Sequence, residues 1–201
     1  MDYIIREKYI SKIKPFINKP VIKILTGMRR VGKSSLLHII KDEILKDVAD
    51  ENKVYINFEA TNLLSINNVN SLLEYLKPLL EDVKGKVYFF FDEIQVIDGW
   101  EEVISDLKHN RDYDIFLTSS NKKLISSLSE KYVEFEIQPF TFSEFKKAFE
   151  NMELSKENLF YKFIQLGGLP FLKYFDLDET PSFEYLNDIY NTVLVKDVLQ
   201  Y

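Results

Sequence analysis

The feature that most constrains this chain is the stretch GMRRVGKS at residues 27–34, which follows the pattern G-x-x-x-x-G-K-[ST] at every defined position. The apolar run VIKILT precedes it, and the following segment, KSSLLHIIKDEILK, repeats apolar residues at helical spacing. A glycine-rich turn between a strand and a helix gathers backbone N–H groups and the helix N-terminus around anionic oxygens. We therefore predict a phosphate loop at residues 27–34, and with it an α/β fold.

The residues of this loop are expected to have different roles. The glycines allow a tight turn, Lys33 reaches the terminal phosphates, and the Ser34 hydroxyl faces Mg²⁺. Arg29 and Arg30 leave several interpretations open: contact with phosphate, pairing with an acid, reach to a neighbouring subunit, or solvated loop charges. The candidate nucleotide-binding residues of the loop are Gly27, Met28, Arg29, Arg30, Val31, Gly32, Lys33, Ser34 and Ser35.

A second apolar strand, VYFFFDE at residues 87–93, ends in two carboxylates. We expect Asp92 to hold Mg²⁺ through its water shell, and Glu93 to orient and polarise an attacking water. The metal candidates are thus Ser34 and Asp92, and the catalytic candidates are Lys33 and Glu93. The alternative is a pair of surface acids that follow a buried strand.

A third group of candidate site residues lies at the end of the segment FLTSSN at residues 116–121. A polar side chain here could sense the γ-phosphate and help to place the water, and Thr118 and Ser120 are taken as nucleotide-binding candidates. Ser119 and Asn121 are candidates for the same role. The alternative is a capped turn that is rich in hydroxyls.

The order of apolar segments predicts a doubly wound α/β core. Strands are expected at 21–26, 53–59, 86–93, 113–120 and 132–137, with helices at 33–46, 70–83 and 99–110 between them. Continuous apolar runs such as VYFFF are typical of parallel strands covered on both faces. From about residue 141 the segments are helical, and Thr141 with Glu144 predicts a capping box. We expect a phosphate-loop core at 1–150 and a small helical appendage at 151–201, which the resemblance described below identifies as an ATPase core and its lid.

Composition excludes several classes of protein. The chain has 201 residues, no cysteine and a formal net charge of -6. Disulfides and thiolate metal sites are therefore ruled out, and a surface devoted to nucleic acid is disfavoured. The charged N-terminus is unlike a signal peptide, and the apolar runs are too short to cross a bilayer. We expect a cytoplasmic protein with no membrane contact.

Taken in order, seven motifs resemble a family of prokaryotic AAA-type P-loop ATPases. They are GMRRVGKSSLL, VYINFE, FFFDEIQVIDGW, IFLTSSN, YVEFEIQPFTFSEF, GGLPF and VLVKDV. In that family the ATPase core is normally followed by a winged helix and a nuclease-like C-terminal domain of unknown function. The resemblance implies ATP and Mg²⁺ as ligands, with Walker A and Walker B motifs. It also implies a three-layer sandwich around a mostly parallel five-stranded sheet, with the phosphate-loop strand central, and a small C-terminal helical lid.

The chain departs from the family pattern in three places. It stops after KDVLQY, which suits either a fragment or a member reduced to the ATPase module. The loop before the fifth strand is shorter than usual. Where the family carries Gly-Arg-Tyr, the letters are Glu130, Lys131 and Tyr132. If that arginine is a finger for the nucleotide, a lysine cannot make the same forked contact, and its loss would slow turnover by ~10³ to 10⁵.

Two functions follow from these observations. The first is an ATP-binding, Mg²⁺-dependent ATPase of AAA type that couples nucleotide state to a lid or a partner. The alternative is a nucleotide-gated interaction module or switch with little or no hydrolysis, which the lost arginine favours. A small-molecule kinase is disfavoured because no second arginine cluster could bind an acceptor phosphate. The partner could be a second copy of the chain or another protein.

Overall fold

The computed structural model describes residues 3–60, 66–110, 112–121, 125 and 128–193. The chain divides into two compact units. The first comprises Met1–Gly27 and Lys33–Glu136, and the second comprises Met28–Gly32 and Ile137–Tyr201. The division thus falls at an earlier residue than 150, and five residues of the phosphate loop group with the helical unit.

The first unit is built on one sheet of five parallel strands in the order β2-β3-β4-β1-β5. The strands are β1 Ile22–Thr26, β2 Lys53–Asn57, β3 Val87–Asp92, β4 Tyr113–Ser119 and β5 Tyr132–Glu136. The parallel five-stranded α/β fold expected from the sequence is therefore confirmed. The phosphate-loop strand, β1, lies inside the sheet, but β4 rather than β1 is the middle strand.

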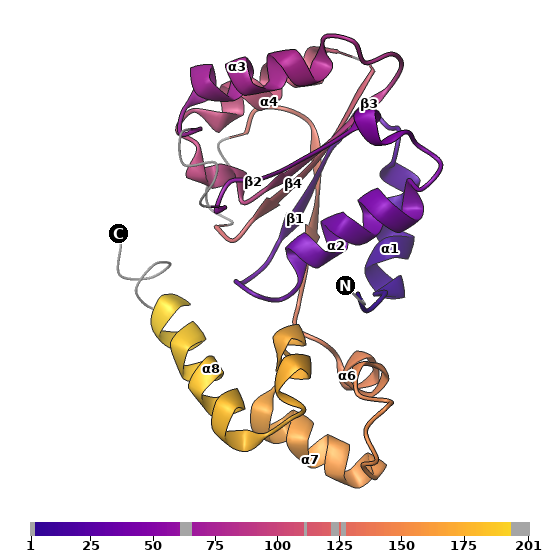
Figure 1. Cartoon of the computed structure of the whole chain (residues 1–201), viewed down its shortest axis with the longest axis vertical. Coiled ribbons are helices and arrows are strands. Elements are labelled where there is room, and N and C mark those ends of the chain that lie inside the picture. The colour runs from indigo at the N-terminus through magenta and orange to yellow at the C-terminus, as the bar shows by residue number, and fades with distance from the viewer. Residues whose placement is uncertain (1–2, 61–65, 111, 122–124, 126–127, 194–201) are drawn as a thin grey trace. The chain divides into compact units, whose positions relative to one another are not determined.

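Helices cover both faces of this sheet, with α3 and α4 on one face and α1 and α2 on the other (Figure 1). The α-helices are α1 Glu7–Ile13, α2 Lys33–Ile39, α3 Val69–Leu80 and α4 Trp100–His109. Within the described residues, three short 3₁₀ helices connect elements of this unit: η1 Lys14–Phe16, η3 Asp50–Asn52 and η5 Ile94–Val96. The expected helix at 33–46 begins as α2 but continues as a π-helix, η2, over Ile40–Ile44.

Strand β3, which lies between β2 and β4, shows why its sequence is almost continuously apolar. All six of its residues are buried. Neighbouring residues in a strand point to opposite faces, so Phe89 and Phe91 join the core beneath α3 and α4, while Phe90 stacks on Phe116 with ring centroids 5.0 Å apart. Burial on both faces thus brings Asp92 to the end of a rigid strand, where it is fully buried.

The second unit is helical, with α6 Phe142–Ala148, α7 Lys156–Leu166, η6 Pro170–Phe175 and α8 Glu179–Val193. The capping box predicted at the start of α6 is present, since Thr141 and Glu144 exchange side-chain and backbone hydrogen bonds. The backbone N–H of Phe140 donates to the carbonyl of Gly168 at 2.7 Å. The part of the last expected helix beyond residue 193 lies outside the described residues.

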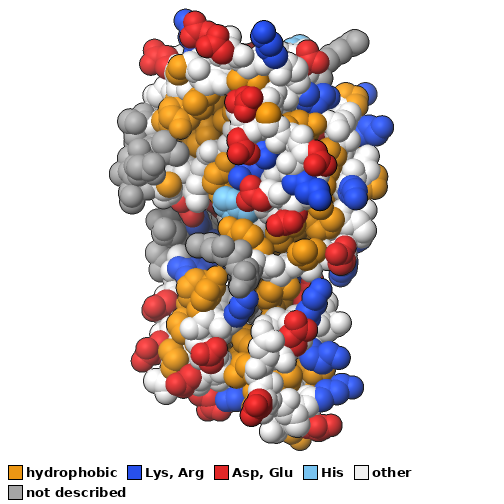
Figure 2. All heavy atoms as spheres, turned by 45° about the vertical axis from the view of Figure 1, so that its right-hand side comes forward, with side chains coloured by type: hydrophobic (Ala, Val, Ile, Leu, Met, Phe, Trp, Pro, Cys, Tyr) orange, Lys and Arg blue, Asp and Glu red, His pale blue; other side chains and the backbone are white. Residues whose placement is uncertain are grey.

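The surface carries charges of both signs. On the face shown in Figure 2, acidic and basic side chains are interspersed, with hydrophobic side chains visible between them. Within the described part of the chain, no helix has the length and apolar character needed to cross a membrane.

Candidate nucleotide-binding site

The candidate site lies at the carboxyl edge of the sheet, where β1, β3 and β4 end side by side. Thr26 at the end of β1 pairs with Ser119 of β4, and β3 ends at Asp92. Ligands of open α/β folds bind outside the carboxyl ends of the strands. The phosphate loop leaves β1 at this edge and leads into α2, which begins at Lys33.

The backbone of the loop explains its two glycines. Gly27 has φ 136° and Gly32 has φ 96°. Residues with a side chain rarely adopt these values, whereas glycine adopts them without steric cost. Arg30, between them, also has a positive φ of 65°. The two glycines of the motif are therefore required by the turn itself.

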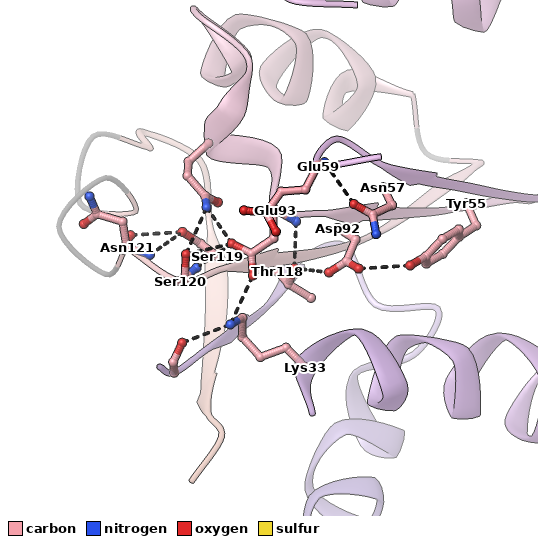
Figure 3. A network of polar contacts seen from close by, with 12 residues as sticks. Lys33, Tyr55, Asn57, Glu59, Asp92, Glu93, Thr118, Ser119, Ser120 and Asn121 are labelled. Carbon is pink, nitrogen blue, oxygen red and sulfur yellow. Dashed lines mark hydrogen bonds and ion pairs between the residues drawn. The ribbon is translucent and has the colours of Figure 1, made fainter. Parts of the chain in front are cut away.

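The Lys33 ammonium is buried and paired at this edge. Its Nζ lies 3.1 Å from Glu93 Oε1 and donates to the Gly27 carbonyl oxygen at 3.1 Å. Figure 3 shows Lys33 extending from the start of α2 toward Glu93. A buried charge is costly unless it is paired, so Glu93 compensates Lys33 in this state of the site.

The Glu93 carboxylate is held by donors from Ser120, the residue directly after β4, and from Gln95 in η5. Its Oε2 accepts from Ser120 N at 3.1 Å and Ser120 Oγ at 2.8 Å, and from Gln95 Nε2 at 2.6 Å. The Glu93 backbone is left-handed, with φ 56° and ψ 49°. Such strain in a non-glycine residue persists only where surrounding contacts enforce it.

Opposing effects act on the pKa of the Glu93 carboxyl. Burial raises the pKa, but the Lys33 ammonium and the hydrogen bonds that the carboxylate accepts lower it by more. The net result is a pKa below the ordinary value of a glutamate carboxyl. Glu93 is therefore ionised at neutral pH, as an acceptor of a proton from water must be.

The Asp92 carboxylate is clamped from the strands on both sides of β3. Its Oδ1 accepts from Thr118 Oγ1 of β4 at 2.5 Å, and its Oδ2 accepts from Tyr55 Oη of β2 at 2.9 Å. The Thr118 hydroxyl in turn accepts from Glu93 N at 2.8 Å. A carboxylate has about four acceptor positions, so these bonds leave Asp92 with capacity for a water or a cation.

The structure brings five of the predicted residues into one network: Lys33, Asp92, Glu93, Thr118 and Ser120 (Figure 3). Thr118 and Ser120 bond to the two acids. Ser119 Oγ instead makes hydrogen bonds with the backbone of Asn121, as expected for the alternative interpretation of a capped turn. Ser34 and Ser35 are half-buried in the first turn of α2.

The residues of the loop that group with the second unit have neighbours in that unit. The Arg30 guanidinium lies 5.2 Å from the centroid of the Tyr185 ring, on α8. A Cβ added to Gly32 would lie 3.6 Å from Pro170 Cγ. Arg30 thus packs on an aromatic ring, a contact that the sequence interpretation did not include.

Two residues of the network were not predicted. Gln95 is one letter of the motif FFFDEIQVIDGW, and its amide donates hydrogen bonds to both Glu93 and Ser120. Tyr55 falls within the strand expected at 53–59, with no separate role assigned to it. Its only signal was its position two residues before the carboxyl end of β2, beside the strand that carries Asp92.

Lys131 lies at the amino ends of the parallel strands, whereas the phosphate loop lies at their carboxyl ends. Ile22, the first residue of β1, donates its N–H to the Lys131 carbonyl at 3.1 Å, whereas the loop follows Thr26 at the other end of that strand. At about 3.3 Å per residue, these ends are roughly 13 Å apart. The position expected to carry an arginine finger is thus remote from the site of its own chain.

Comparison with protein families gives one match over most of the chain. The model of a family described as AAA domain matches residues 19–146. An uncharacterized protein of Haemophilus influenzae is 30% identical over 96% of this chain and 50% of its own length. The protein MJ1544 of Methanocaldococcus jannaschii is 35% identical over 94% of this chain and 44% of its own length. The chain therefore spans about half the length of these curated relatives.

Solved structures show the same fold at low sequence identity. AMPPCP-bound DnaA from Aquifex aeolicus matches with a TM-score of 0.57 and 16% identity, over 96% of this chain and 73% of that one. The signal transduction ATPase PH0952 from Pyrococcus horikoshii, which has a tetratricopeptide repeat sensor, matches with a TM-score of 0.54 and 14% identity, over 96% and 33%. At these identities the likeness concerns the fold.

Proposed function

Because the chain belongs to the AAA-domain family of P-loop ATPases, we propose that it binds ATP and hydrolyses it in a Mg²⁺-dependent reaction. The observation that supports this most strongly is the convergence of Lys33, Asp92 and Glu93 at one edge of the sheet. A phosphate-binding lysine, a metal-binding acid and a second acid are the parts that phosphoryl transfer to water requires.

Each residue then has a distinct role. The backbone N–H groups of the loop and the Lys33 ammonium would bind the phosphates. Glu93, ionised and fixed by Gln95 and Ser120, would orient the attacking water and accept its proton. Carboxylate and hydroxyl oxygens are the ligands that Mg²⁺ prefers, so Asp92 and Ser34 would hold the ion. Bound there, Mg²⁺ would neutralise charge on the phosphate oxygens.

We further propose that the helical unit or a protein partner senses the nucleotide. Met28–Gly32 belongs to both the phosphate loop and the second unit, and Arg30 packs on Tyr185 of α8. A change in the loop on phosphate binding would therefore act directly on α8. A partner, either a second copy or another protein, would read that change.

A nucleotide-gated switch with little hydrolysis is the second candidate. The ion pair between Lys33 and Glu93 favours it, and so does Lys131, which stands where the resemblance described above leads us to expect an arginine. In such a module Glu93 would leave Lys33 when ATP binds, but no finger would speed the chemistry. Turnover at saturating ATP separates the two functions.

The test is Mg²⁺-dependent ATP binding and phosphate release by the purified chain, beside Lys33→Ala and Glu93→Gln. We expect the parent to release phosphate, Lys33→Ala to lose binding, and Glu93→Gln to bind without turnover. Lys84→Ala and Glu102→Gln, which make the same changes at exposed positions, serve as matched controls. Tight binding without release above the Glu93→Gln level would establish the switch, and the absence of binding would refute both functions.

A further inference from the structure

The Asp92 carboxylate is fixed by a tyrosine of the neighbouring strand. Tyr55 lies on β2, where the register pairs Asn57 with Asp92. Its hydroxyl donates to Asp92 Oδ2 at 2.9 Å, while Thr118 of β4 donates to Oδ1 (Figure 3). Each oxygen is thus held from a different strand, and the plane of the carboxylate is set by the pair.

The Tyr55 hydroxyl is suited to remain a donor. A phenol carries one O–H donor, and an ionised carboxylate can only accept, so the hydrogen bond runs from Tyr55 Oη to Asp92 Oδ2. Its hydrogen bond to an ionised carboxylate is of the stronger, charge-assisted kind.

The Tyr55 ring is held in turn by an aromatic stack. Its centroid lies 4.4 Å from that of His38, and Tyr3 stacks on His38 at 5.6 Å with an interplanar angle of 8°. His38 belongs to α2, the helix that begins with Lys33. The stack therefore limits the positions from which the hydroxyl can reach Asp92.

We propose that Tyr55 is a positioning residue for Mg²⁺: it orients the Asp92 carboxylate so that the free acceptor positions face the ion and its water. This inference rests on the proposed function, because it requires Asp92 to serve Mg²⁺. Partners that orient a metal-binding carboxylate typically change metal affinity by about 10- to 100-fold when they are removed. Since Thr118 remains to hold Oδ1, the smaller change is expected here.

The test is Tyr55→Phe, which removes the hydroxyl and keeps the ring. Tyr88→Phe is the matched control, because Tyr88 donates its hydroxyl to Asn18 Oδ1 at 2.8 Å, away from the site. A fluorescent, non-hydrolysable ATP analogue is titrated at increasing Mg²⁺, and bound Mn²⁺ is counted by electron paramagnetic resonance. For Tyr55→Phe we expect half-maximal metal response at about tenfold higher concentration. We expect unchanged affinity for the analogue without metal, and near-parental turnover at saturating Mg²⁺.

Equal metal responses in Tyr55→Phe and Tyr88→Phe, with a parent that does respond to Mg²⁺, would overturn this inference and leave the proposed function intact. A parent that binds the analogue with no response to either metal would refute the metal-dependent function and the inference together. A loss of metal-free affinity in Tyr55→Phe would also overturn it, because that result indicates a general structural role. His38→Ala, which removes the stack but keeps the hydroxyl, is a second variant. We expect it to shift the metal response in the same direction, by about two- to threefold, and an unchanged response would count against the inference.

Discussion

Lys33 Nζ lies 3.1 Å from Glu93 Oε1, so the phosphate-binding lysine and the acid expected to activate water form an ion pair in this state of the site. Three donors from Ser120 and Gln95 hold the other oxygen of the same carboxylate. For Lys33 to bind a phosphate, this pair must loosen. Nucleotide binding and the position of Glu93 are therefore linked.

The first prediction concerns that linkage. Glu93→Gln removes the charge that engages Lys33, so a non-hydrolysable ATP analogue should bind about fivefold more tightly, equivalent to about 1 kcal/mol. Isothermal titration calorimetry at saturating Mg²⁺ measures this affinity. The analogue separates the effect from trapping of unhydrolysed ATP. In a Lys33→Ala background Glu93→Gln should give no gain, and a gain there would contradict the linkage.

The second prediction concerns acid stability. The pKa of the Glu93 carboxyl is lowered from its ordinary value, because Lys33 and the hydrogen bonds outweigh the effect of burial. As the pH falls below the ordinary pKa, the unfolded chain binds more protons at this group than the folded chain does. The stabilisation from the pair is thus complete above the ordinary pKa and is lost as the pH falls through the folded-state pKa.

Urea unfolding of the parent and Glu93→Gln at about pH 7 and about pH 3.5 tests this sign. The free energy of unfolding of the parent should exceed that of the variant by more at the higher pH. A difference that grows on acidification would show that burial, rather than the ion pair, dominates the pKa of Glu93.

The strands β1, β3 and β4 could be predicted because nearly all of their residues are buried. A strand that is buried on both faces has a continuous apolar run in its sequence. The sequence therefore predicts β3, whose six residues are all buried. The phosphate loop could be predicted because the turn requires glycine at positive φ, as at Gly27 and Gly32. In each case one local segment carries the whole physical requirement.

The remaining parts of the site depend on contacts between distant segments. Tyr55 reaches Asp92 only because β2 pairs with β3 in one register, and nothing in the letters KVYIN distinguishes this tyrosine from a packing residue. The π-helical turn that begins after Ile39 does not interrupt the helical spacing of the apolar residues, so the sequence did not predict it. The grouping of Met28–Gly32 with the helical unit is likewise a tertiary property. The roles of the site residues remain predictions.

The third prediction concerns a buried ion pair at the other end of the sheet. Lys23 Nζ pairs with Asp114 Oδ1, and the side chains are 0% and 1% exposed. Asp114 Oδ2 also accepts from Asn18 N at 2.7 Å. Lys23→Met leaves the Asp114 charge buried without its partner, so unfolding should become easier by about 3–5 kcal/mol.

Adding Asp114→Asn to Lys23→Met removes the uncompensated charge, and the double variant should recover part of that loss. Urea unfolding of the parent, of both single variants and of the double variant gives the coupling free energy between Lys23 and Asp114. Strictly additive losses would mean that the two charges contribute independently.

The fourth prediction concerns Gly168 in the helical unit. A Cβ at this position would lie 2.3 Å from the Phe140 carbonyl oxygen, a backbone atom that cannot rotate away. Gly168→Ala must therefore displace the segment that carries the Phe140 N to Gly168 O hydrogen bond. We expect a loss of about 2–3 kcal/mol, measured by urea unfolding.

Gly167→Ala is the comparison variant, because a Cβ there has open space. Its φ of 76° and ψ of -167° lie in a backbone region that is essentially restricted to glycine, so its expected cost of about 1–3 kcal/mol comes from backbone strain alone. A larger loss in Gly167→Ala than in Gly168→Ala would show that backbone strain outweighs the close approach to Phe140.

The last prediction concerns Lys131, which lies at the end of the sheet opposite to the phosphate loop of its own chain. An arginine that reaches the γ-phosphate contributes about 10³ to 10⁵ in rate, but a side chain cannot span the roughly 13 Å that separates the ends of β1. In dilute solution Lys131→Arg should therefore hydrolyse ATP at the parental rate, within about twofold. Lys131→Ala, the control, should do the same. A large acceleration by Lys131→Arg at high dilution would contradict the position that the sheet assigns to this residue. An acceleration that grows with protein concentration would instead show that the residue acts on the site of another copy.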